Sequence, residues 1–160
     1  AVLEEISGRL LLMQSGEIAP PQQMRDGRLK FLFTEICQKI DLSQPTVVAL
    51  EDTFFAKNVK SALTLGQAKG VARLAAEINN LPVFEYAPTA VKMAVVGYGG
   101  ATKDQIKEMV FQILKPTCKI ASEHEADAAA IAICHVHSAQ WQAKLALSLV
   151  QEQRYKTENA

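Results

Sequence analysis

Residues 45 to 51 are Pro45-Thr46-Val47-Val48-Ala49-Leu50-Glu51, an apolar run between a proline and a single carboxylate. A β-prone run without polar alternation is typical of a central strand that is covered on both faces. Residues 46–50 are therefore expected to form such a strand, and Glu51 stands at its carboxyl end. Ligand-binding groups of α/β sheets gather at this end of the strands. Glu51 is the first candidate site residue, and a solvated acid just past a strand is the alternative.

The segments on either side of this strand predict further strands and helices. Gly66 and Gly70, four residues apart among alanines, indicate a helix that packs closely on the sheet or on another helix. The first expected elements are a β-hairpin from strands at 1–6 and 10–18 with a turn at 7–9, a helix over 22–40, and the strand at 46–50. A helix over 58–78 and a strand at 81–86 follow, and then a short helix capped by Thr89 that ends near Gly97. The last two expected helices are one that starts at a Thr102–Gln105 capping box and one over 123–151 with a candidate break near His137. This order predicts one α/β domain over residues 1–160, with a mixed β-sheet and α-helices packed on it.

The composition is that of a folded globular protein of 160 residues, with 49% hydrophobic residues and a formal net charge of zero. Zero net charge argues against binding of nucleic acid by bulk positive charge alone. Residues 54–119, however, hold nine basic and four acidic residues, so the balance conceals a basic segment. Three cysteines without a CxxC pair predict residence in the cytoplasm. The absence of a long apolar run predicts no membrane span.

A second group of chemically active residues opens the last predicted helix. His124 and Asp127 are three residues apart, so they share one face of a helix close to its start and could reach one metal ion. The alanine and isoleucine run that follows would pack this helix into the core. The alternative is an acidic first turn that matches the helix dipole, with His124 as a surface histidine. His135 and His137 lie too far along the helix to share that metal and are interpreted as structural or exposed.

Phe54 and Phe55 follow Glu51 directly, and Lys57 and Lys60 come next. Two aromatic rings flanked by lysines suit unpaired bases and phosphates, because stacking contributes about 1–3 kcal/mol per base. The alternative is that one or both phenylalanines fill the core. Asp52 is interpreted as a turn residue.

The residues from Ala49 to Asn58 and from Ser61 to Gly70 closely resemble the signature of the RuvC family, the bacterial Holliday junction resolvases. The match continues through Val83–Pro88, Val91-Lys92, Val95–Gly97 and Glu125–Ala128. The resemblance implies an RNase H-like fold, with helices on both faces of the mixed sheet. It also implies a homodimeric crossover junction endodeoxyribonuclease that acts in recombination and DNA repair. Such an enzyme uses Mg²⁺ or Mn²⁺, two ions per subunit, to nick two strands of a four-way junction symmetrically.

Individual roles follow from the positions that match the family. Glu51 matches the family's second catalytic carboxylate, and Asp127 matches its last. His124 falls where some members have Asp and others His, as a metal ligand or a proton-transfer group. The positions implied in DNA binding are two lysines near the scissile phosphate and a loop that contacts the junction, namely Lys92, Lys103, Phe54, Phe55, Lys57 and Asn58.

The chain departs from the family at its front. The family begins with a strand that ends in Asp-Pro-Gly, whose Asp is the central metal ligand, and nothing before Ala1 supplies it. We expect about ten to fifteen residues, one strand and its turn, to be missing through truncation. The alternative function is an RNase H-like module that binds branched DNA without cutting it. The branch-migration proteins RuvA and RuvB are candidate partners through the same resemblance.

Overall fold

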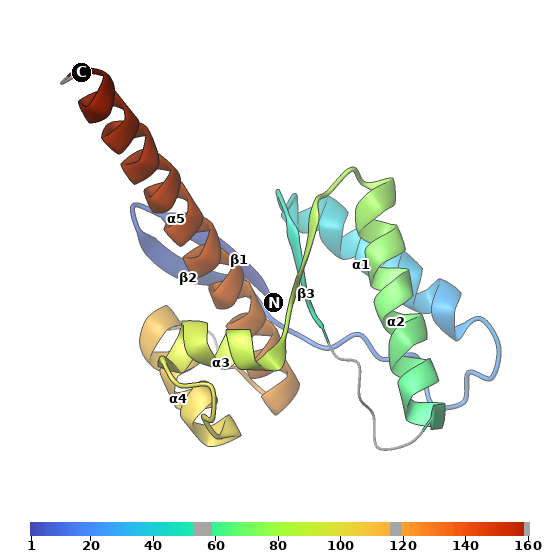
Figure 1. Ribbon diagram of the computed structural model, residues 1–160. Coiled ribbons are helices and arrows are strands. Elements are labelled where there is room, and N and C mark those ends of the chain that lie inside the picture. The colour runs from blue at the N-terminus through green and yellow to red at the C-terminus, as the bar shows by residue number, and fades with distance from the viewer. Residues whose placement is uncertain (53–58, 116–119, 159–160) are drawn as a thin grey trace.

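The computed structural model describes residues 1–52, 59–115 and 120–158, with the side chains of 143–158 left out. Its elements, in chain order, are β1 (Val2–Ile6), β2 (Arg9–Gln14), α1 (Arg28–Ser43), β3 (Val48–Glu51), α2 (Val59–Ile78), β4 (Val83–Tyr86), α3 (Pro88–Val96), α4 (Lys103–Leu114) and α5 (Glu123–Glu158). Every predicted element is present (Figure 1). The Thr102–Gln105 capping box is also confirmed at the start of α4.

Three predicted details of the helices are wrong. Helix α1 begins at Arg28 and not at 22, because Gly27 adopts a left-handed conformation with φ of 76° directly before it. Helix α3 begins at Pro88 after an Ala87 cap, so Thr89 is not its cap. Helix α5 runs through His137 without a break.

The first two strands form an antiparallel hairpin in which Leu3 pairs with Leu12. Ser7 and Gly8 both have positive φ, 52° and 77°, as a tight two-residue hairpin turn requires. Alternation along β2 buries Leu10 and Leu12 against the core. The other face of the hairpin, with Met13, is exposed.

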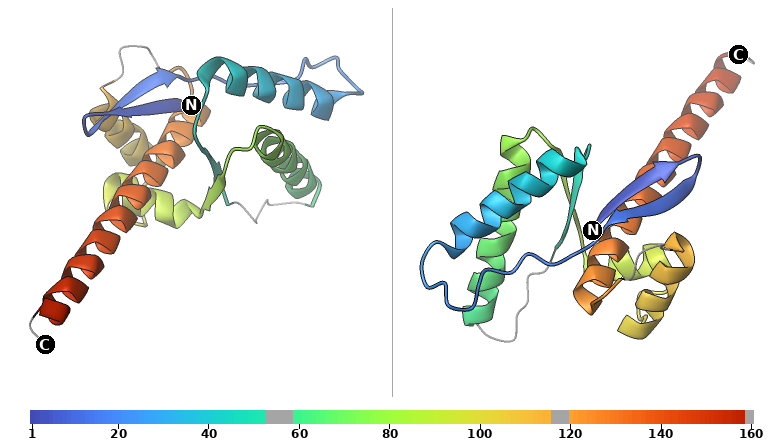
Figure 2. Two further views of the ribbon diagram at one scale, coloured as in Figure 1. Left: turned by 90° about the horizontal axis from the view of Figure 1, so that it is seen from above. Right: turned by 180° about the vertical axis from the view of Figure 1, so that it is seen from behind.

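Strands β3 and β4 pair in parallel, with Val48 opposite Val83 and Glu51 opposite Tyr86. Helices α1 and α2 lie on one side of this pair and α5 lies on the other, as Figures 1 and 2 show. Parallel and antiparallel pairing are therefore both present, and helices cover both faces, as predicted. Within the described residues the strands form two separate two-stranded sheets and not one continuous sheet.

The hydrophobic core lies between the hairpin, α3, α4 and the first half of α5. Val110, Ala129 and Ile133 are completely buried there, which confirms that the alanine and isoleucine run of α5 packs inward. In β3, in contrast, Val48, Ala49 and Leu50 are only partly buried and Glu51 is exposed. The predicted covering of this strand on both faces is therefore incomplete.

A groove of about 620 Å³ explains the partial exposure of β3. Its walls include Val47, all four residues of β3, and residues 1–3, which lead into β1. Successive side chains of a strand point to opposite faces, so a groove that touches all of them follows the strand's edge. The chain's N-terminus lies between the hairpin and β3 (Figures 1 and 2). We call this feature the strand groove.

Helix α2 has an exposed outer face. A Cβ atom placed on Gly66 or Gly70 would meet no described atom within 4 Å. The predicted packing of this helix on another helix is confirmed, since α2 packs against α1, but Gly66 and Gly70 do not form that contact. Val59, Leu63 and Leu74, which are 76%, 64% and 49% exposed, lie near the glycines at helical spacing. We call these five residues the α2 stripe.

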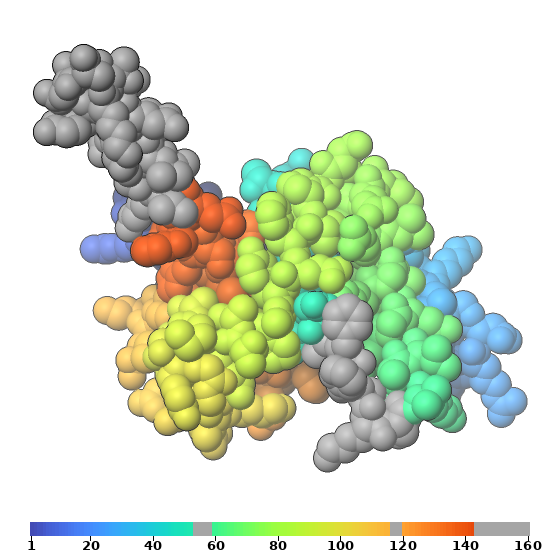
Figure 3. All heavy atoms as spheres, in the orientation of Figure 1, coloured from blue at the N-terminus to red at the C-terminus, as the bar shows by residue number. Residues whose placement is uncertain are grey.

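In the space-filling view, α2, β4 and α3 form a continuous surface, and β3 is visible only as a small teal patch between them (Figure 3). In the part of the chain that the structure describes, no helix has both the length and the apolar character needed to cross a membrane.

Candidate active site

Glu51 lies at the carboxyl end of β3 on the side that faces α5. The pairing register places Glu51 opposite Tyr86, and the Tyr86 hydroxyl lies 2.8 Å from Nδ1 of His135 on α5. Burial raises the pKa of Glu51, and the negative charge of Asp127 on α5 raises it further. The two predicted carboxylates, 76 positions apart in the sequence, therefore lie within electrostatic reach of each other at one end of β3.

Positive charge borders these carboxylates from two helices. Lys103 and Lys69 partly offset the rise in the pKa of Glu51. Lys103 is the first residue of α4, and its Nζ lies 3.8 Å from Oε2 of Glu123. Lys103, Glu123 and Asp127 line one small polar hollow. A lysine at the start of α4 is thus placed beside the carboxylates, as a phosphate contact would require.

The first turn of α5 is fixed to the segment that follows β2. Glu125 is a buried carboxylate, 8% exposed, and it accepts a hydrogen bond of 2.5 Å from the Ser15 hydroxyl. Ser122 donates a second hydrogen bond to Glu17 and caps the backbone N–H of Glu125. These contacts hold the turn that carries His124 and Asp127, so both predicted ligands belong to an anchored part of the fold.

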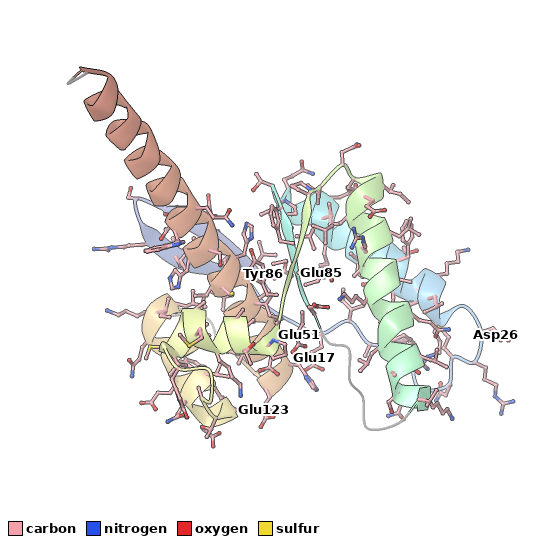
Figure 4. The ribbon with its side chains drawn as sticks, in the orientation of Figure 1. Glu17, Asp26, Glu51, Glu85, Tyr86 and Glu123 are labelled. Carbon is pink, nitrogen blue, oxygen red and sulfur yellow. The ribbon has the colours of Figure 1, made fainter. Side chains whose placement is uncertain are left out.

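Glu51 and Asp127 provide the carboxylate oxygens that Mg²⁺ and Mn²⁺ prefer. His124 lies in the same turn as Asp127 and is exposed. Among the described residues, no three His, Cys, Asp or Glu side chains form a metal-binding group. The donor chemistry therefore fits a divalent cation, and the ligand set that these residues offer is incomplete. Glu17 and Glu51, both labelled in Figure 4, line the strand groove.

The predicted DNA-binding residues are placed unequally. Lys92 lies on α3, the helix that follows β4, and is partly buried. Phe54, Phe55, Lys57 and Asn58 lie outside the described residues.

Sequence reasoning missed several contacts beside the site. Asp52 is part of an ion-pair group with Lys69 and Glu85 and is more than a turn residue. The spacing of four between Lys69, Arg73 and Glu77 on α2 was the available signal for a charged helix face. The structural interpretation of His135 and His137 agrees with their contacts, since His137 Nδ1 lies 2.9 Å from the Ala94 carbonyl oxygen.

Comparison with known proteins decides the family. The family model "Crossover junction endodeoxyribonuclease RuvC" matches residues 1–135. The chain belongs to the RuvC family. The resemblance seen in the sequence is therefore confirmed, and with it the assignment to a family of DNA-cleaving enzymes.

Several RuvC proteins are similar over most of their length. RuvC of Chloroflexus aggregans is 46% identical over 139 residues, which cover 86% of this chain and 85% of that protein. RuvC of Pelotomaculum thermopropionicum is 42% identical over 151 residues, 91% of this chain and 90% of that protein.

Two solved RuvC structures share the fold. Thermus thermophilus RuvC superposes with a TM-score of 0.75 at 29% identity, over 89% of this chain and 86% of that one. A second structure, T. thermophilus RuvC in complex with Holliday junction substrate, gives a TM-score of 0.79 at 28% identity and covers 88% and 86% of the two chains. The RNase H-like fold expected from the RuvC resemblance is therefore confirmed.

Proposed function

We propose that this chain is a Holliday junction resolvase, an endonuclease that nicks two strands of a four-way DNA junction in recombination and repair. The observation that carries the proposal is the approach of Glu51 to Asp127, beside Lys103, in a chain of the RuvC family. The T. thermophilus relative in complex with Holliday junction substrate supports junction DNA as the partner.

RuvC nucleases are metal-dependent, and we propose Mg²⁺ or Mn²⁺, two ions per subunit, for this one. When bound, such ions activate water and stabilise the leaving oxygen. Glu51 and Asp127 would hold the ions, and His124 would act as a further ligand or carry a proton. Lys103 and Lys92 neutralise phosphate charge as the DNA strand approaches. The repulsion between Glu51 and Asp127, which raises the pKa of Glu51, would be relieved by the positive charge of the ions.

The strand groove suggests where the rest of the site belongs. We propose that a strand-forming segment from outside the 160 residues fills it, lies between β1 and β3, and joins the two sheets into one. Among the residues that the structure describes, β3 pairs only with β4, and this open edge together with the apolar lining of the groove supports the proposal. Glu51 lines one end of the groove, so an Asp at the end of the added strand would complete the carboxylate set. The residues that the gene encodes ahead of Ala1 test the proposal directly.

The α2 stripe supports the homodimer. Large apolar side chains and two glycines on one exposed helical face allow a second helix to approach closely. We propose that a second copy of the chain packs its own α2 there. Residues 54–58 follow the site directly and are proposed to contact junction bases and phosphates. RuvA and RuvB, and residence in the cytoplasm, stay predictions.

A second candidate function is a module that binds branched DNA without cutting it. The incomplete ligand set among the described residues favours it. Cleavage of a synthetic four-way junction with Mg²⁺, next to a gel shift without metal, separates the two functions. We expect the protein encoded in full by its gene to cleave. Glu51→Gln should lower the cleavage rate by at least about 10³-fold, since the ions stabilise the transition state by several kcal/mol.

The matched control for Glu51→Gln is Glu108→Gln. Glu108 is an exposed carboxylate of α4 whose side chain accepts a hydrogen bond from Gln112, and its replacement should leave cleavage unchanged. Both variants should bind the junction as the unmodified protein does. Equal cleavage by Glu51→Gln and Glu108→Gln would contradict the catalytic role of Glu51. Binding without cleavage by the unmodified protein would favour the binding module.

A further inference from the structure

An ion-pair group lies on the face of β3 and β4 that is turned away from Asp127. Lys69 of α2 places its Nζ 3.2 Å from Oδ1 of Asp52 and 2.8 Å from Oε2 of Glu85. The three side chains are only 25%, 30% and 28% exposed. One lysine thus bridges two carboxylates in a sheltered position, where a charge pair holds its geometry better than on open surface.

The two carboxylates belong to the ends of two neighbouring strands. Asp52 directly follows Glu51, and its backbone N–H donates a hydrogen bond of 2.8 Å to the Tyr86 carbonyl oxygen. Glu85 precedes Tyr86 and faces Leu50 in the pairing register. Side chains alternate between the two faces of a strand. Asp52 and Glu85 therefore point toward α2, and Glu51 and Tyr86 point toward α5, as the contacts of Glu85 with Lys69 and of Tyr86 with His135 confirm.

Arg73, one turn further along α2, offers a natural comparison. Its guanidinium bonds to Glu77 at 2.9 Å and to Glu85 at 3.2 Å. Its side chain is 55% exposed, and its described partners are both acids outside β3. Among the described residues, Lys69 bonds Asp52, the residue after Glu51, whereas Arg73 contacts the same group through Glu85.

We propose that Lys69 is a positioning residue for Glu51. By holding Asp52 and Glu85 together behind the sheet, it fixes the end of β3 so that the Glu51 carboxylate stays directed at Asp127. It also fixes the point from which the chain leaves β3 toward residues 53–58. Lys69 acts on the geometry of the site through Asp52 and Glu85, in addition to the direct effect of its charge, which partly offsets the rise in the pKa of Glu51. The inference rests on the proposed resolvase function for its kinetic test, and on the geometry alone for its structural test.

The kinetic test uses the protein encoded in full by its gene and a synthetic four-way junction with Mg²⁺. Lys69→Met should lower kcat by about 10- to 100-fold, the effect of a misplacement of about 1 Å in a catalytic group. KM and the metal-free affinity for the junction should change less than about twofold, because the contacts with DNA remain. Lys69→Arg keeps the positive charge and can bond both carboxylates, so it should restore kcat to within about threefold. Arg73→Met is the control and should leave kcat unchanged.

A structural test is independent of cleavage. The Asp52 amide hydrogen exchanges with solvent when the end of β3 opens. Lys69→Met should speed this exchange at least about tenfold in metal-free protein, and Arg73→Met should not. Equal kcat for Lys69→Met and Arg73→Met, or equal losses in Lys69→Met and Lys69→Arg, would overturn the proposal, as would unchanged exchange at Asp52. If the unmodified protein does not cleave, the resolvase assignment fails, and the exchange measurement still decides the role of Lys69.

Discussion

Filling the strand groove should stabilise the protein by about 5 kcal/mol. The test adds to the chain the residues that its gene encodes ahead of Ala1 and compares the extended chain with the chain that starts at Ala1. Strand β1 has five residues and β3 has four, so an occupant matched to both is about five residues and ~17 Å long. Such a strand would form about ten hydrogen bonds with its two neighbours, and at about 0.5 kcal/mol net for each bond they contribute about 5 kcal/mol.

Side-chain burial supplies the larger share of the stabilisation. About four apolar side chains directed at the groove lining, at about 2 kcal/mol each, add roughly 8 kcal/mol. Ordering five residues costs about 1.5 kcal/mol each. The balance is about 5 kcal/mol in favour of the filled groove, equivalent to a rise in Tm of roughly 10–20 °C for a chain of this size.

Thermal unfolding followed by circular dichroism, at equal protein concentration, measures this difference. The control is the extended chain with a proline at the centre of the added segment, because proline removes a ladder hydrogen bond from a central strand. The proline variant should melt close to the chain that starts at Ala1. Equal Tm values for the extended and unextended chains, within about 2 °C, would refute the assignment of the groove to a strand.

Two further predictions concern acid stability and assembly. Burial lowers the pKa of His135 below its usual 6.5. The unfolded chain therefore binds more protons than the folded chain below that pH, and the stability of the fold should decrease as the pH drops from 7 to 5.5. His135→Phe should reduce this pH dependence of the Tm in thermal melts, and an unchanged pH dependence would contradict the role of His135. If the chain forms the proposed dimer through α2, Leu63→Asp, which places a charge in the α2 stripe, should convert it to a monomer in analytical ultracentrifugation. Met13→Asp, at a site 56% exposed on the hairpin, is the control and should stay dimeric; a dimeric Leu63→Asp protein would exclude α2 as the interface.

The elements that the sequence predicts well depend on local patterns. The apolar run before Glu51 predicts β3 because its strand signal lies within seven residues, and the Thr102–Gln105 capping box needs only one helical turn. Family resemblance then assigns Glu51 and Asp127 to one site, which spacing along the chain alone does not do.

The contacts that the sequence does not predict join distant residues. The Ser15–Glu125 hydrogen bond spans 110 positions and the Lys69–Asp52 pair spans 17, and no local pattern marks either partner. The glycines of α2 indicate that something packs closely there, and they do not say whether it is the same chain or another one. The expected break near His137 is wrong because residues 123–158 contain no glycine or proline to interrupt the helix.

The two faces of helix α2 have a geometric consequence for the reaction. One face carries the α2 stripe, and another carries Lys69, whose bonds reach the end of β3. In a dimer paired through α2, each active site would be linked to the shared helical interface by the bonds of Lys69 to Asp52 and Glu85 and of Arg73 to Glu85. The 20-residue helix is about 30 Å long, a rigid spacer on the scale of the DNA itself. The length of the paired α2 helices would then set the distance between the two nicks.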